Sequence, residues 1–315
     1  MKEKIIQIQQ EVKKVILGKD PIIDKVLTAI LCQGHVLLED IPGVGKTTMA
    51  TAFGKALGLE VKRVQFTSDT MPSDIIGFSV YDMKTGQLQY KPGPIMTNLL
   101  LADEINRTSS KTQSALLEAM EEGQVTVDGI TRQLNQPFVV LATQNPVGTA
   151  GTRMLPTAQL DRFLMKISMG YPERASQIEI MKERHHQNPL DKVEAVADVS
   201  EILGLIEETK QIYISDLIYE YISELVEKTR ENSYIQLGIS PRGALALCRG
   251  AKAAAYLSGR DYVNSADIEK IFLSICGHRL ILAPKARLQE ETADSILERI
   301  MGEVSKPDIK ESVIR

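Results

Sequence analysis

The chain has 315 residues, of which 43% are hydrophobic and 25% charged, a balance typical of globular proteins with room for two domains. Its net charge of −4 disfavours a protein whose whole surface binds nucleic acid. The three cysteines are widely spaced and show no CxxC pair, which is typical of reduced, buried thiols and not of a disulfide or zinc site. The N-terminus lacks a signal-peptide core, and no stretch approaches the ~18 uncharged apolar residues of a membrane span. We therefore expect a cytoplasmic protein without direct membrane insertion.

The first half of the chain alternates between helical and strand patterns. Apolar spacing predicts helices over residues 3–16 and about 22–33. Short apolar runs that stop at turns, as buried parallel strands do, then follow at 35–39, 61–66, 98–102, 138–143 and 163–167. Helical segments separate them at about 47–58, 109–121 and 157–161. This alternation predicts an α/β domain with a doubly wound parallel sheet over residues 1–175.

Two β-hairpins interrupt this pattern. The first covers residues 78–90 and turns through a Met-Lys-Thr-Gly segment. The second covers residues 124–134 and turns at Asp128-Gly129, a strong hairpin signal. Both are expected to be insertions in the α/β domain.

Strand signals fade after Tyr171-Pro172. Apolar stripes predict helices at 214–229, 265–274 and 291–302, and Ser240-Pro241 predicts the start of a helix that runs to about residue 258. The sequence therefore predicts a second, smaller, all-α domain over residues 185–315.

A phosphate-binding loop is predicted between the strand at 35–39 and the helix at 47–58. The segment Asp40-Ile-Pro-Gly-Val-Gly-Lys-Thr47 can wrap backbone N–H groups around phosphate, and the helix N-terminus adds its dipole. Lys46 would reach the β- and γ-phosphates, and the Thr47 hydroxyl would bind Mg²⁺. Asp40 replaces the first Gly of the usual G-x-x-x-x-G-K-[ST] pattern. The expected nucleotide contacts are Pro42, Gly43, Val44, Gly45, Lys46, Thr47 and Thr48.

Polar residues also follow two later strands. Asp103 and Glu104 end the strand at 98–102, and ligands of such sheets bind outside the carboxyl ends of the strands. Asp103 can hold Mg²⁺ and Glu104 can polarise the attacking water. Asn145 follows the next strand, where a neutral amide can contact the γ-phosphate, although an Asn-Pro turn is the alternative.

Two arginines could stabilise charge on a transferring phosphoryl group, either within the chain or on a neighbouring subunit. Arg162 stands in Gln159-Leu-Asp-Arg-Phe, and Arg242 in Ser240-Pro-Arg-Gly. Each could instead be an ordinary surface arginine, which is the more common case for any single arginine, and residue physics alone does not distinguish the two interpretations.

Several segments closely resemble the MoxR family of AAA+ ATPases. They are Asn98 to Arg107, Lys111 to Met120, Ala142-Thr-Gln-Asn-Pro146, Ala158 to Phe163, Gln65-Phe-Thr67, Pro72-Ser-Asp74 and Ser240-Pro-Arg-Gly243. The resemblance implies an AAA+ core followed by a helical lid, with hairpin 78–90 as the helix-2 insert. It further implies Asn145 as sensor 1, Arg162 as the arginine finger, Arg242 as sensor 2, and Gly18 and Lys19 beside the adenine.

The family resemblance also implies ATP and Mg²⁺ as cofactors and a homo-oligomer, typically a hexameric ring. Members act as chaperone-like factors that remodel, assemble or mature partner proteins, often with von Willebrand A domain proteins. One segment departs from the family: residues 147–156 lose acidic charge and gain Arg153, an alternative trans arginine. A nucleic-acid-stimulated motor or transcriptional regulator is the alternative function, which the net charge and the scarcity of aromatic residues disfavour.

Overall fold

The computed structural model describes residues 2–40, 43–145, 154–186 and 188–307. Its centre is a five-stranded parallel sheet with the strand order β2-β5-β8-β1-β9. The strands are β1 Val36–Glu39, β2 Val61–Gln65, β5 Leu99–Asp103, β8 Val139–Gln144 and β9 Met165–Ile167. All five predicted core strands are confirmed, so the sheet has the doubly wound arrangement expected from the sequence.

Helices cover both faces of the sheet, which explains why its central strands β5, β8 and β1 are mostly apolar and do not alternate with polar residues. The edge strand β2 differs, since it carries Lys62, Arg63 and Gln65. Leu99 and Leu101 belong to the core on one face, and Leu100 and Ala102 to the core on the other. The first face packs against α1 Lys2–Lys13, α2 Asp20–Leu31 and α3 Lys46–Leu57. The second packs against α4 Pro72–Ile76, η1 Ile105–Arg107, α5 Ser110–Glu122 and α6 Thr157–Leu160.

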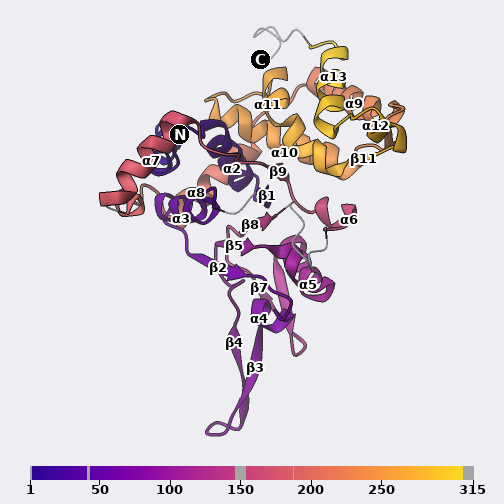
Figure 1. Cartoon of the computed structure of the whole chain (residues 1–315). Coiled ribbons are helices and arrows are strands. Elements are labelled where there is room, and N and C mark those ends of the chain that lie inside the picture. Colours follow the sequence, from indigo (N-terminus) through magenta and orange to yellow (C-terminus); the bar gives the residue numbers. More distant parts are fainter. Residues whose placement is uncertain (1, 41–42, 146–153, 187, 308–315) are drawn as a thin grey trace.

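Both predicted hairpins are confirmed. The first pairs β3 Gly77–Asp82 with β4 Gln87–Pro92, and the second pairs β6 Gln124–Val127 with β7 Ile130–Gln133. The β3–β4 hairpin projects from the end of the molecule opposite the C-terminal helices (Figure 1). The Arg132 guanidinium lies 3.9 Å from the centre of the Tyr90 ring, so a cation–π contact joins the two hairpins.

The C-terminal half is a helical lid. It comprises α7 Arg174–His186, η2 Pro189–Lys192, α8 Val199–Lys210, α9 Asp216–Glu231, α10 Pro241–Leu257, α11 Ser265–Cys276, η3 Gly277–Arg279, α12 Pro284–Leu288 and α13 Ala293–Glu303. It also holds one short antiparallel pair that was not predicted, β10 Ile235–Leu237 with β11 Ile281–Leu282. Helix α7 lies across the interval left between the two predicted domains. No helix among the described residues has the length and apolar character needed to cross a bilayer.

The lid is joined to the sheet through packing and through one buried arginine. Helix α10 packs against α2, and α11 against β9. Arg279 of η3, which is 5% exposed, donates through Nε to Asp161 Oδ1 at 2.7 Å and through Nη2 to the Phe163 carbonyl at 2.7 Å. These two residues flank Arg162, so the lid fixes the backbone that carries this arginine.

Candidate nucleotide site

A central pocket of about 400 Å³ opens at the carboxyl end of the sheet. Most of the residues singled out in the sequence meet there. Its lining residues are Gly43, Gly45, Lys46, Thr47, Thr48, Arg63, Gln65, Asp103, Glu104 and Asn145.

The loop before α3 is open enough to receive phosphate. Gly43 and Gly45 have φ of +87° and +98°, and a Cβ on either would meet no atom within 4 Å. Only glycine adopts these angles readily, so the backbone here curves around open space. Gly45 is the N-cap of α3 and has no side chain with which to cap the helix. Its N–H groups and its dipole therefore fit an anion.

Lys46 is the cation of this loop. Its Nζ donates to the Asp40 carbonyl at 2.8 Å. Partial burial lowers the pKa of the Lys46 ammonium, while the carboxylates of Asp40, Asp103 and Glu104 act in the opposite direction. A phosphate group would favour the charged ammonium in the same way.

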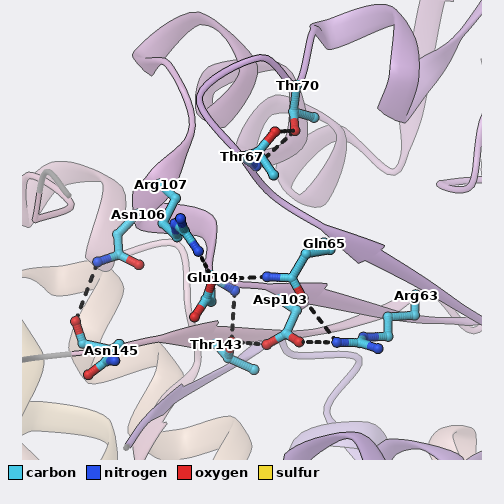
Figure 2. Close-up of polar contacts among 10 residues, drawn as sticks. All are labelled: Arg63, Gln65, Thr67, Thr70, Asp103, Glu104, Asn106, Arg107, Thr143 and Asn145. Carbon is cyan, nitrogen blue, oxygen red and sulfur yellow. Dashed lines mark hydrogen bonds and ion pairs between the residues drawn. The ribbon is translucent and has the colours of Figure 1, made fainter. Parts of the chain in front are cut away.

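The acidic pair at the end of β5, Asp103 and Glu104, is held by a buried threonine of the neighbouring strand. The Thr143 hydroxyl donates to Asp103 Oδ1 at 2.5 Å and accepts from the Glu104 backbone N–H at 2.8 Å (Figure 2). Glu104 has φ 57° and ψ 49°, a left-handed conformation that is uncommon for a residue with a side chain. Such backbone strain is concentrated at functional sites.

Side chains from β2 and η1 complete this network. Arg63 donates to Asp103 Oδ2 at 2.7 Å, whereas Gln65 and Arg107 both donate to Glu104 Oε2, at 2.9 and 2.8 Å (Figure 2). The Glu104 carboxylate is thus oriented by two donors at one oxygen.

Asn145 directly follows β8, on the other side of the acidic pair. Its carbonyl accepts from Asn106 Nδ2 at 3.4 Å (Figure 2). The Asn106 side chain is buried, and its Oδ1 has no hydrogen-bond partner among the residues that the structure describes. The side-chain amide of Asn106 in η1 therefore contacts the backbone of Asn145.

A flanking pocket adjoins the central one and shares Gly43, Gly45 and Thr48 with it. Leu17, Lys19 and Val44 contribute to its wall, together with apolar residues of the lid side. Gly18, at φ +66°, allows a close approach of α7, because a Cβ there would lie 2.4 Å from Ser176 Oγ. Lys19 Nζ donates to the Tyr171 carbonyl at 2.8 Å. The predicted contact Pro42 lies outside the described residues.

The two predicted arginines are absent from both pockets and lie together elsewhere. Arg162 Nη1 is 2.9 Å from Glu121 Oε2, and Arg242 Nη1 is 3.1 Å from Glu121 Oε1. Arg162 also donates to the Leu117 carbonyl at 2.9 Å. One carboxylate at the end of α5 thus pairs an arginine of the core with an arginine of the lid. The alternative, Arg153, falls in a part of the chain that the structure does not describe.

Sequence reasoning assigned no role to several polar residues of these networks. Gln65 and Thr143 stand at the carboxyl ends of core strands, so the strand-end rule that selected Asp103 could also have selected them. Arg63 and Glu121 carry no such local signal. Their partners depend on which strands and helices are neighbours in space.

The fold and the site define an ATPase of the AAA class. The family of ATPases associated with various cellular activities matches residues 35–165, and the AAA lid domain matches residues 227–300. A candidate ATPase of Cytophaga hutchinsonii, solved as a crystal structure, superposes with a TM-score of 0.91 at 40% identity, covering 98% of this chain and 96% of that one.

The relatives define the family more closely. The chain is 48% identical over 306 residues to the uncharacterized protein YeaC of Bacillus subtilis (97% of this chain, 95% of YeaC). It is 36% identical to Chaperone MoxR1 of Mycobacterium tuberculosis (95% and 81%) and 33% identical to Protein MoxR of Methylorubrum extorquens (88% and 87%). The chain belongs to the MoxR family of AAA+ ATPases, and nucleotide binding follows from this membership.

Proposed function

We propose that this chain hydrolyses ATP to ADP and phosphate with Mg²⁺ and uses the cycle for chaperone-like remodelling, assembly or cofactor maturation of partner proteins. One observation carries the proposal. The glycine loop with its lysine, the acidic pair and the strand-end amide, far apart in the sequence, line the same pocket at the carboxyl edge of the sheet.

Each of these residues has a role that fits its place. The bound Mg²⁺–ATP supplies the phosphoanhydride bond that is cleaved and the metal that neutralises its charge. Lys46 and the N–H groups of α3 would hold the phosphates, and Thr47 and Asp103 would hold the metal. Glu104 would orient the attacking water and accept its proton, while Asn145 would position the water or the γ-phosphate.

Arg162 and Arg242 complete a neighbour's site in this proposal. Their shared partner, Glu121, lies outside the pocket residues of their own chain, which favours action in trans for both. AAA+ proteins are generally oligomeric, and we propose a homo-oligomeric ring, with six subunits as the family resemblance implies. An arginine supplied in trans accelerates phosphoryl transfer by about 10³–10⁵ in known cases.

The β3–β4 hairpin supports a protein as the client. Tyr81, Met83 and Leu88 are 60%, 91% and 66% exposed on it. Exposed apolar side chains gathered on one projecting element are typical of protein contacts. Proteins with von Willebrand A domains are the partner class that the resemblance adds.

A contiguous set of contacts joins the pocket to this hairpin. Gln65, which holds Glu104, is followed by the Thr67–Thr70 turn shown in Figure 2, and the Thr70 carbonyl accepts from Thr112 of α5 at 2.8 Å. The turn leads directly into α4 and β3. We propose that a change at the Glu104 carboxylate is transmitted along this path to the base of the hairpin.

The test is turnover by the Glu104→Gln variant. The amide cannot accept the water proton, so we expect turnover to fall by about 10² or more while ATP binding persists. Glu122→Gln, on the exposed end of α5, neutralises a carboxylate outside the pocket and serves as the matched control. Normal turnover in Glu104→Gln, or no ATP binding by the unaltered protein, would refute the proposal.

A further inference from the structure

Asp40 occupies the position where the usual phosphate loop begins with glycine, and its side chain is built into the fold. It is 7% exposed. Its carboxylate accepts from the backbone N–H groups of Met169 and Gly170, the latter at 3.2 Å, and from the Ser168 hydroxyl at 3.3 Å. Gly170 has φ +59°, so two successive N–H groups converge on one anion, as in a backbone nest. A glycine at position 40 could make none of these contacts.

The segment held by this carboxylate forms one wall of the flanking pocket. We call residues 168–172 the strap. Met169 and Pro172 of the strap line the pocket. Lys19 holds the strap a second time, through the Tyr171 carbonyl at 2.8 Å. The wall is therefore fixed from two sides, by an anion at its start and by a cation near its end.

Asp40 also belongs to the phosphate loop through its backbone. Its carbonyl accepts from Lys46 Nζ at 2.8 Å, and its N–H donates to the Gln144 carbonyl at 3.1 Å. Asp40 thus contacts Lys46 of the phosphate loop with its main chain and the strap with its side chain. We infer that Asp40 is a positioning residue that fixes the strap against the phosphate loop and so sets the affinity for the nucleoside part of the nucleotide. This inference rests on the proposed nucleotide site.

The test compares two ligands on the intact protein. In the proposed site, ADP would contact both pockets, whereas inorganic tripolyphosphate would contact only the phosphate loop. Asp40→Asn keeps the shape but loses the negative charge that the N–H groups share. By titration calorimetry with Mg²⁺, we expect its Kd for ADP to rise about tenfold, the equivalent of one charge-assisted hydrogen bond, and its Kd for tripolyphosphate to stay within about twofold.

A matched control and a second variant make the result specific. Glu39→Gln neutralises the adjacent carboxylate, which pairs with Lys166, and should leave both constants unchanged. Gly170→Ala disturbs the strap through its positive φ and leaves Asp40 in place, because the nearest atom to its Cβ is 4.0 Å away. Gly170→Ala should also raise the Kd for ADP and leave that for tripolyphosphate unchanged. If Asp40→Asn does not fold, this variant alone tests the inference.

Two results would overturn the inference. One is an equal loss of tripolyphosphate binding, which would place the effect of Asp40 on the phosphate loop itself. The other is an unchanged affinity for ADP in both Asp40→Asn and Gly170→Ala. Failure of the proposed function has a different signature, since the unaltered protein would then bind neither ligand.

Discussion

At the scale of single residues, Thr143 has the most consequential position that the sequence did not reveal. Its hydroxyl is fully buried, donates to Asp103 and accepts from the Glu104 N–H. Thr143→Val keeps the shape of the side chain and removes both contacts. We expect kcat to fall on the order of tenfold to a hundredfold, because a small misplacement of Glu104 disturbs the attack geometry, while the Kd for ADP changes little. Steady-state kinetics and nucleotide titration measure the two quantities.

Thr143→Ser is the matched control, since it retains the hydroxyl and loses only a methyl group. It should keep most of kcat, whereas Val should also cost about 1–3 kcal/mol of stability by leaving the Glu104 N–H unpaired. If Ser and Val lower kcat equally, packing and not the hydroxyl supports the acidic pair.

At the scale of secondary-structure elements, His35 connects β1, β8 and α5 at the start of the sheet. From the residue before β1, its Nδ1 accepts from the Val140 N–H of β8 at 3.0 Å. Its Nε2 lies 2.9 Å from the Met120 carbonyl of α5, so this nitrogen carries the proton. Burial lowers the pKa of His35 from 6.5 to about 4, aided by the charge of Arg249 and opposed by the bond to Met120. A second proton would displace the Val140 contact.

The sign of the pH dependence follows from this lowered pKa. Above pH 6.5 the imidazole is neutral in both states, and between pH 6.5 and about 4 only the unfolded chain takes up the proton. The stability contributed by the neutral, buried His35 is therefore fully present above pH 6.5, and it is lost as the pH falls from 6.5 towards about 4. From pH 7 to pH 5 the unaltered protein should lose about 2 kcal/mol more than His35→Gln, measured by urea unfolding. His278, whose pKa burial also lowers, is common to both proteins and cancels. Parallel losses in the two proteins would contradict the expectation.

The elements also show where sequence patterns stop being informative. The core strands and both hairpins were predictable, because apolar runs and the Asp-Gly turn are local signals. Helix α7 was missed because its sequence, RASQIEIMKERHH, has few apolar residues, and β10 and β11 are too short for a pattern. Helix α8 could have been found, since Asp198 and Glu201 form a capping box at its start. The strand order, which places Arg63 beside Asp103, has no local signal.

At the scale of the whole molecule, contacts from both the lid and the core position the pair Arg162 and Arg242. Arg279 holds the residues on both sides of Arg162, through the Asp161 carboxylate and the Phe163 carbonyl. Glu121 joins Arg162 to Arg242 of α10. The sequence left open whether Arg242 acts on its own subunit's nucleotide or on a neighbour's. Its place beside Arg162, away from the central pocket, predicts action on the neighbour.

Mixed assemblies test this prediction. A Lys46→Ala subunit lacks the phosphate lysine but keeps both arginines, whereas an Arg242→Ala subunit has an intact pocket and lacks one arginine. Each variant alone should be nearly inactive. When they are mixed, a Lys46→Ala subunit can present Arg242 to the intact pocket beside it, so we expect ATPase activity to reappear in the mixture. Arg162→Ala with Lys46→Ala should behave in the same way.

The control separates rescue between subunits from simple mixing. A double variant, Lys46→Ala with Arg242→Ala, has no arginine to donate and should restore nothing when added to Arg242→Ala. If Lys46→Ala rescues Arg162→Ala but not Arg242→Ala, then Arg242 serves its own pocket and must leave Glu121 when the lid closes. In that case the ion pair between Arg242 and Glu121 must break during each cycle, and the lid must move relative to α5. Rescue of both variants instead means that one neighbour contributes a core arginine and a lid arginine as a unit, with Glu121 keeping the two side by side.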